Sequence, residues 1–260
     1  MIIRPAAVAG SFYPDSPDVL ARSVDTMLSE AGETAAGPSP KALITPHAGY
    51  IYSGPTAACG YALLNADKIR RVVLLGPTHR VPVSGLVLPE ADAFETPLGA
   101  VELDRIGMNS VEHLAQVTIE GSSHAFEHSL EVHLPFLQRR LNQFTLIPFT
   151  VGRARPEMVA EVLDLLWGSE ETLIVISSDL SHYHPYETAR KIDTETADTI
   201  IQMEPTISHE QACGATPING LLTCTEKHPL RAKLIDLRNS GDTAGPRDRV
   251  VGYGAFAFYE

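Results

Sequence analysis

The sequence predicts an α/β fold, a three-layer α/β/α sandwich around a mostly parallel central sheet. Short apolar runs rich in β-branched residues, such as 71–75 and 173–176, are typical of strands that are buried on both faces. Segments with helical periodicity alternate with these runs, which favours a sheet covered by helices. Three of the runs lead into polar segments that contain histidine, and in open α/β sheets ligands bind beyond the carboxyl ends of the strands. We therefore expect a functional site at that edge of the sheet.

Residues 1–14 mix Gly and Pro with aromatic residues, so this segment is predicted to lie over the domain without regular structure. A helix is predicted to begin at Pro17, because Ser16 is a favoured N-cap residue and Pro fits the first helical position. Asp104 is expected to cap a later helix. The elements expected between these two caps are a loop at 32–40, a strand at 41–45, a helix at about 55–65, a strand at 71–75 and a hairpin formed by the runs 85–88 and 99–103.

The second half of the chain continues the alternation of helices and strands. Apolar residues at 3- and 4-residue steps predict a helix over 127–141, in which Pro135 should introduce a kink or move the start. No internal repeat, low-complexity tract or interdomain linker is present in the sequence, so residues 1–260 are predicted to form one domain. The remaining elements are expected to be a strand at 144–149, a helix at 156–167, a strand at 172–176, helices at 187–203 and 218–226, and strands at 231–237 and 250–258.

Charge and composition argue against nucleic-acid and membrane binding. The formal net charge is −12 and the chain has no run of Lys or Arg, which disfavours an affinity for nucleic acid or for an anionic membrane. The N-terminus lacks the apolar core of a signal peptide, and no segment is apolar over the length of a membrane span. Three cysteines at unrelated spacings suit a reducing compartment. We predict a soluble, cytoplasmic protein.

His47 and His79 are candidate metal ligands. Each follows an apolar run through a turn that contains proline. A neutral imidazole held by a rigid turn is well suited to bind a first-row metal. The alternative is that each histidine caps a helix or bonds to a backbone carbonyl.

Asp179 and His182 follow the apolar run 173–176 and lie three residues apart. In a turn or a first helical turn they can share a face, so the carboxylate can orient the imidazole or act as a ligand itself. An acid beside a histidine is the usual arrangement of a general base. The alternative role for Asp179 is a helix N-cap. His184 precedes a proline and is expected to be exposed.

Other candidates carry a weaker signal. Cys213 lies in a loop beside Gly214, where the backbone can approach a ligand closely, although a lone cysteine is most often a small buried apolar residue. His124 and His128 are four residues apart, as are Glu127 and Glu131, but solvated helix faces often show this spacing. The motifs of P-loop and dinucleotide-binding proteins, serine hydrolases and common zinc proteases are absent from the sequence.

Several motifs taken in order resemble the Memo family, whose prokaryotic members are often called AmmeMemoRadiSam system protein B. The resemblance covers nearly the whole chain. The motifs are Arg-Pro at 4–5, Gly-Ser-Phe-Tyr-Pro at 10–14, Pro-His-Ala-Gly-Tyr at 46–50 with Tyr-Ser-Gly at 52–54, Gly-Pro-Thr-His at 76–79, Glu-His-Ser-Leu-Glu-Val-His-Leu-Pro at 127–135, Ser-Ser-Asp-Leu-Ser-His-Tyr at 177–183 and Cys-Gly at 213–214.

The Memo family is similar in fold to the class III extradiol dioxygenases, which are non-haem iron enzymes. The resemblance implies that His47, His79 and Cys213 bind a metal ion. It implies that Asp179 borders or joins the site and that His182 corresponds to the acid/base histidine of the dioxygenases. The departure is the cysteine, since extradiol dioxygenases complete their two-histidine site with a carboxylate. A thiolate is softer and shifts the preference toward Zn, Cu(I) or a differently poised iron.

The function expected from the resemblance is metal-dependent, dioxygenase-like redox chemistry on a small molecule, with Fe(II) as the first choice of metal and Cu or Zn as the others. His182 would donate or accept the proton and Asp179 would orient it. A metal-facing Cys213 would have a lowered pKa and react rapidly with alkylating reagents in the metal-free protein.

Two other functions fit the same residues. One is a metal-binding or peptide-binding scaffold without turnover, and the other is a metal-assisted hydrolase. Animal Memo proteins are described as binding phosphotyrosine peptides, but this acidic sequence offers no Arg cluster for a phosphate. Protein partners of the AmmeMemoRadiSam type are implied by the resemblance, and no nucleic-acid or membrane partner is expected.

Overall fold

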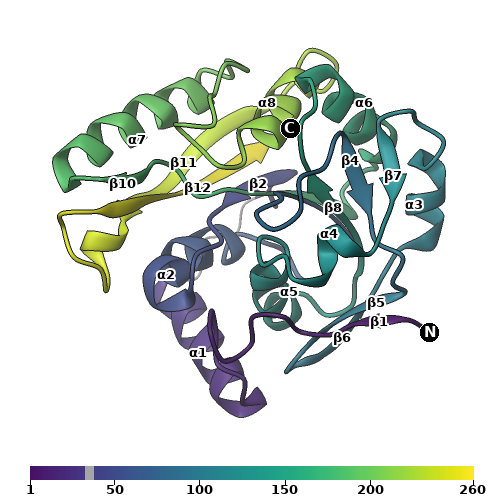
Figure 1. Cartoon of the computed structure of the whole chain (residues 1–260), viewed down its shortest axis with the longest axis horizontal. Helices are drawn as coiled ribbons and strands as arrows, with labels where there is room; N and C mark the ends of the chain where they lie inside the picture. Colours follow the sequence, from purple (N-terminus) through teal and green to yellow (C-terminus); the bar gives the residue numbers. More distant parts are fainter. Residues whose placement is uncertain (33–37) are drawn as a thin grey trace.

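The computed structural model describes residues 1–32 and 38–260, in which nine strands form one large sheet with helices on both faces (Figure 1). The strands β2, β9, β3 and β8 are parallel to one another, whereas β12 and β4 run antiparallel to their inner neighbours β2 and β8. The α/β sandwich is confirmed, and the predicted parallel pairing holds at the centre of the sheet. In order along the sheet, the strands are β10 (His182–His184), β12 (Val250–Tyr259), β2 (Ala42–Thr45), β9 (Thr172–Ser177), β3 (Arg71–Pro77), β8 (Thr145–Val151), β4 (Leu86–Leu88) and β7 (Val117–Ile119), and β11 (Arg231–Asn239) also pairs with β12.

Two groups of helices enclose the sheet. Figure 1 shows α1 (Pro17–Glu30), α2 (Tyr50–Tyr61) and α5 (Leu134–Arg140) on one face, and α6 (Pro156–Leu166), α7 (Tyr186–Ile201) and α8 (Ala215–Cys224) on the other. The short helix α3 (Arg105–Val111) packs against α6. Every residue of β2 and β9 is buried, which explains why these strands read as unbroken apolar runs. Within the described residues, none of the helices has the length and apolar character needed to cross a membrane.

The proline signals identify helix starts with mixed success. Helix α1 begins at Pro17 as predicted, but the Ser16 side chain makes no capping hydrogen bond. Helix α2 begins at Tyr50 and contains Pro55, so the predicted start at about 55 is wrong; the Tyr50 side chain is buried and its hydroxyl donates to the carbonyl of Val132. Pro135 moves the start of α5, as one of the two predicted outcomes, and a 3₁₀ turn precedes that helix. The loop predicted at 32–40 lies partly outside the described residues.

The predicted hairpin between 85–88 and 99–103 is wrong. Residues 86–88 are the strand β4, which is buried in the large sheet beside β8. The hairpin is formed instead by β5 (Ala93–Thr96) and β6 (Gly99–Glu102), and β1 (Ile3–Arg4) pairs with β5 to make a separate three-stranded sheet. Gly99 has a φ of +114°, a conformation that favours glycine, at the tight turn of this hairpin. The apolar run 86–88 suits a doubly covered strand better than a surface hairpin.

Candidate metal centre

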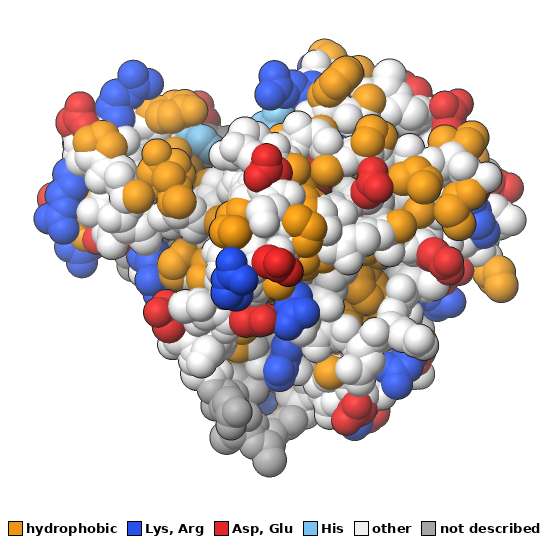
Figure 2. All heavy atoms as spheres, turned by 90° about the horizontal axis from the view of Figure 1, so that it is seen from below, with side chains coloured by type: hydrophobic (Ala, Val, Ile, Leu, Met, Phe, Trp, Pro, Cys, Tyr) orange, Lys and Arg blue, Asp and Glu red, His pale blue; other side chains and the backbone are white. Residues whose placement is uncertain are grey.

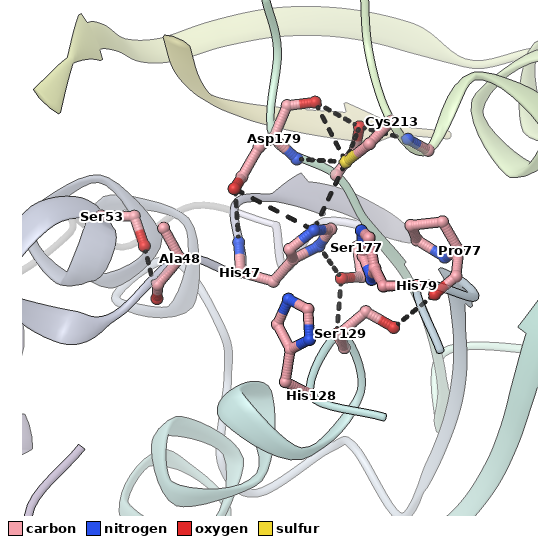
Figure 3. Close-up of polar contacts among 12 residues, drawn as sticks. His47, Ala48, Ser53, Pro77, His79, His128, Ser129, Ser177, Asp179 and Cys213 are labelled. Carbon is pink, nitrogen blue, oxygen red and sulfur yellow. Dashed lines mark hydrogen bonds and ion pairs between the residues drawn. The ribbon is translucent and has the colours of Figure 1, made fainter. Parts of the chain in front are cut away.

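Three histidines converge where β2 and β3 end. His47 leaves β2, His79 leaves β3, and His128 lies in the loop after the short helix α4 (Ser122–Ala125). One ligand atom from each of the three lies within 4.8 Å of the other two, and such a group could hold a metal ion. Figure 3 shows the three imidazoles facing a common space, with Asp179 and Cys213 on the far side of His47 from His128. The strand-end position predicted for His47 and His79 is therefore confirmed.

The His47 ring is fixed in one tautomer by a chain of hydrogen bonds. Its Nδ1 lies 2.6 Å from the Ser177 hydroxyl, which itself donates to the carbonyl of Ser129 at 2.6 Å. Because a serine hydroxyl has one hydrogen, Nδ1 of His47 must be the donor to Ser177, and Nε2 keeps its lone pair. Burial, together with the neighbouring histidines, holds the pKa of His47 well below its ordinary value. The ring is neutral and can act as a ligand through Nε2.

His79 is oriented by the carboxylate of Glu127. Its backbone N–H donates to Glu127 Oε2 at 2.5 Å and its Nδ1 lies 2.8 Å from Oε1. Burial alone would raise the pKa of Glu127, but hydrogen bonds and charge from His79 lower it to about 2. The carboxylate is therefore ionised and accepts the Nδ1 proton of His79. A carboxylate behind a ligating histidine is the usual outer support of a metal site.

His128 has a buried ring nitrogen without a hydrogen bond. Its backbone N–H donates to Glu127 Oε1 at 3.0 Å, and its ring packs against Phe12 with the centroids 4.7 Å apart. Nδ1 lies 3.2 Å from Glu127 Oε1 but forms no hydrogen bond among the described residues. Burial lowers the pKa of His128 to about 4, so the ring is neutral. A neutral imidazole with an unsatisfied buried nitrogen fits a metal ligand.

Cys213 contacts His47 rather than the whole cluster. Its Sγ lies 3.3 Å from His47 Nε2 and accepts a hydrogen bond from the backbone N–H of Asp179 at 3.3 Å. Burial, and then the charge of Asp179, raises the pKa of the Cys213 thiol to about 12. The predicted lowering of the Cys213 pKa is thus wrong for the metal-free protein, because no cation compensates for the loss of water. The rapid reaction of this thiol with alkylating reagents stays a prediction. The other cysteines, Cys59 and Cys224, lie in helices as predicted.

Asp179 supports His47 rather than His182. Its Oδ1 accepts the backbone N–H of His47 at 2.8 Å, while Oδ2 lies 4.0 Å from His47 Nε2. Burial raises its pKa. Among the described residues no hydrogen bond joins Asp179 to His182, and no helix begins here, so the helical turn and the N-cap alternative are both wrong. The two side chains nevertheless line the same cavity, and His182 interacts electrostatically with the carboxyl group of Asp179. The chain enters the sheet instead, since Leu180 N–H donates to Gly252 at 2.8 Å.

A cavity of about 570 Å³ opens in front of the histidines. His182, on β10, is half-buried and lines the cavity, as do Asp179 and the three histidines of the cluster. Figure 2 shows a notch in the molecular surface with histidine side chains exposed at it. His184 is half-buried, although it was expected to be exposed, because β10 pairs with β12.

The N-terminal segment ties the loop that carries His128. Arg4 is buried; it donates to the carbonyls of His124 at 2.9 Å and Glu127 at 2.6 Å and forms an ion pair with Glu131. The Glu131 carboxylate also accepts the hydroxyl of Tyr13 at 2.5 Å. The segment predicted to lie over the domain thus does so, through specific buried contacts, apart from the short strand β1.

Sequence reasoning missed His128 and Glu127. The four-residue spacings of His124 from His128 and of Glu127 from Glu131 are typical of one face of a solvated helix. Residues 126–130 are not helical, however, so the members of each pair have unrelated environments. His124 is buried, and its Nε2 lies 2.9 Å from the carbonyl of Val87. The available signal was the position of Glu127 and His128 inside a motif that carries the family resemblance.

The comparison with known protein families decides the identity. The sequence model described as Memo-like protein matches residues 4–257. The chain belongs to the Memo family. A MEMO1 family protein of Methanosarcina barkeri is 35% identical, covering 97% of this chain and 98% of the relative. A MEMO1 family protein of Archaeoglobus fulgidus is 36% identical, covering 98% of this chain and 99% of the relative.

Among solved structures, an uncharacterized protein of Escherichia coli K12 shares the fold of this Memo family member. The TM-score is 0.55 at 13% sequence identity, and the match covers 84% of this chain and 99% of that chain. This likeness supports the α/β architecture alone. The family assignment and the histidine cluster are independent observations, since one comes from sequence comparison and the other from geometry.

Proposed function

We propose that this Memo family protein binds one first-row transition metal ion through His47, His79 and His128 and uses it in redox chemistry on a small molecule. The observation that carries the proposal is the convergence of three histidine rings, two of which have Nδ1 held by Ser177 and Glu127. Imidazole ligands suit Fe, Cu and Zn. Fe(II) is the first choice because the Memo family resembles the extradiol dioxygenases.

Cys213 is proposed as a further ligand that can join His47 on the same ion. The distance of 3.3 Å between Cys213 Sγ and His47 Nε2 is compatible with two ligands of one ion, since metal–sulfur and metal–nitrogen bonds are about 2.3 and 2.0 Å long. The backbone N–H of Asp179 already points at Sγ and would stabilise a thiolate. Asp179 itself is proposed to fix the turn after β2 by holding the His47 backbone.

His182 is proposed to exchange a proton with the bound small molecule. It lines the cavity, and its side chain makes no hydrogen bond to the described residues, so both ring nitrogens are available to a ligand. A bound iron or copper ion would supply one-electron redox chemistry and Lewis acidity. The aromatic side chains of the cavity would restrict the access of water to the reacting group.

The test begins with metal binding. Metal-free protein is titrated with Fe(II) under anaerobic conditions, with Cu and with Zn, and stoichiometry is measured by elemental analysis after gel filtration. We expect one ion per chain in the parent. His47→Ala, His79→Ala and His128→Ala should each lower occupancy, Cys213→Ser should lower affinity, and the exposed His113→Ala is the matched control.

The second stage measures oxygen uptake by the iron-loaded protein with a panel of small molecules. His182→Gln should retain the metal and lose about 10²- to 10⁴-fold in turnover, the usual contribution of an acid/base group. If all three histidine variants bind metal like the parent, the proposed ligand set is wrong. Full occupancy with equal turnover in His182→Gln would favour the scaffold function instead.

A further inference from the structure

Beyond the histidines, four aromatic side chains line the cavity. Phe12, Tyr52, Tyr183 and Tyr253 line it together with the cluster, and its volume of about 570 Å³ is in the range of small-molecule sites. The rings come from four separate segments: the N-terminal segment, α2, β10 and β12. Flat apolar surfaces favour ligands with a flat unsaturated body, because stacked and edge-to-face ring contacts add to the burial of apolar area.

One positively charged side chain, that of Arg249, lines this cavity. Arg249 is the single Lys or Arg that lines it within the described residues, and its guanidinium carbon lies 5.0 Å from the centroid of the Tyr183 ring. The Arg249 side chain forms no ion pair or hydrogen bond with the described part of the chain. In a protein of net charge −12, an arginine left without a carboxylate is available to an anionic ligand.

Tyr183 is held at this place by an unusual backbone. Its φ is +62°, in the left-handed region that a tyrosine rarely adopts, and it is not at the end of a helix. The register of β10 against β12 shifts between His182 and His184, so Tyr183 is bulged out of the ladder and 62% exposed. Bulges next to functional sites redirect a side chain, and this one presents the Tyr183 ring to the cavity and to Arg249.

We propose that the cavity binds a small molecule with a flat unsaturated body and a single carboxylate, with the body among the aromatic rings and the carboxylate on Arg249. One guanidinium offers two parallel N–H donors, which match one planar carboxylate. A phosphate dianion would need more positive charge than the one arginine that lines the cavity. The inference extends the proposed function, since it names the substrate class of the same site.

The experiment uses three matched probes: 2-naphthoate, its neutral analogue 2-naphthamide, and the saturated decahydronaphthalene-2-carboxylate. Affinities are measured by calorimetry and ligand-observed NMR, on the protein as purified and again after chelation of metal. The parent should bind 2-naphthoate at least about tenfold more tightly than 2-naphthamide, the ratio expected for a charge-assisted hydrogen bond. It should also prefer 2-naphthoate to the saturated carboxylate.

Two pairs of variants assign these preferences to residues. Arg249→Met should abolish the preference for carboxylate over amide. Arg247→Met should preserve it, because Arg247 has the same charge and lies two residues away, over the Tyr186 ring and outside the cavity lining. Tyr183→Leu should reduce the preference for the flat probe, whereas Tyr183→Phe should keep it.

Several results would overturn the inference. They are no binding of 2-naphthoate by the parent up to its solubility limit, an unchanged preference in Arg249→Met, an equal loss in Arg247→Met, or equal binding of the flat and saturated carboxylates. Measurements on the chelated protein separate this inference from the metal proposal. Recognition that depends on Arg249 without metal supports the inference even if the histidines bind no ion, and metal binding without such recognition contradicts the inference alone.

Discussion

At the scale of single residues, the three histidines have different partners, and each partner sets a property of the ring. Ser177 fixes the tautomer of His47 through its own bond to Ser129, whereas Glu127 combines a charge with a hydrogen bond to His79. Glu127 also accepts the backbone N–H of His128, so one carboxylate connects two members of the cluster. The geometry of the cluster therefore depends on side chains outside it.

Replacement of Glu127 by Gln should weaken metal binding more than it weakens the fold. The amide retains the size of the side chain but loses the negative charge that accepts the Nδ1 proton of His79, and such supporting residues typically contribute about 10- to 100-fold in metal affinity. Affinity is measured by competition with a coloured chelator, and stability by urea unfolding of the metal-free protein. The exposed Glu95→Gln is the control. A fall in stability with unchanged affinity would restrict Glu127 to a structural role.

At the scale of elements, the N-terminal segment, residues 1–14, holds the loop 124–131 in place through buried contacts. Arg4 and Glu131 are both nearly inaccessible to water, and their ion pair is surrounded by hydrogen bonds that satisfy the remaining donors and acceptors. The N-terminal segment also places Phe12 against His128. The loop has little regular structure, so its position depends on these contacts with a segment more than a hundred residues earlier in the sequence.

Arg4→Met should destabilise the protein by about 3–5 kcal/mol, because it leaves a buried carboxylate without its charged partner. The comparison is Arg139→Met, which breaks an exposed ion pair with Asp25 and should change stability by about 1 kcal/mol or less. Both are measured by urea unfolding at neutral pH. Similar values for the two variants would show that the buried pair contributes no more than a surface pair.

At the scale of the whole molecule, buried titratable groups link stability to pH. Burial lowers the pKa of His133 to about 3 and that of His124 to about 4. Both rings stay neutral in the folded protein at pH values where the unfolded chain, with a histidine pKa near 6.5, binds protons. Asp193 affects stability in the opposite direction on acidification. Burial raises its pKa to about 6, so below that pH the folded state binds a proton that the unfolded state does not.

The metal-free protein should therefore lose stability as the pH falls from about 6.5 toward 4. Each buried histidine contributes a slope of up to about 1.4 kcal/mol per pH unit, and Asp193 offsets one of them below about pH 6. Asp193→Asn removes the offset, so its loss of stability on acidification should be steeper than that of the parent. Urea unfolding at a series of pH values tests both statements, and equal slopes for parent and variant would contradict the sign assigned to Asp193.

The sequence by itself determined the fold class and two members of the cluster. The runs that end at His47 and His79 are mostly apolar because their strands are covered on both faces, and parallel strands bring their carboxyl ends to one edge. Local pattern was therefore sufficient to predict that these two residues meet. The same logic predicted the buried strand that leads to Asp179 and His182.

Only the tertiary structure decided the third histidine and the supporting contacts. His128 and Glu127 lie in an irregular loop, where no periodicity relates a side chain to its surroundings. The loop is held by Arg4, which is far from it in the sequence. Asp179 and His182 reach the same cavity without a helical turn between them, because the chain from Leu180 onward pairs with β12. Strand ends are fixed by local burial patterns, whereas loops are fixed by contacts with distant segments. This is why the sequence located the edge of the sheet where the cluster lies but not the third histidine of the cluster.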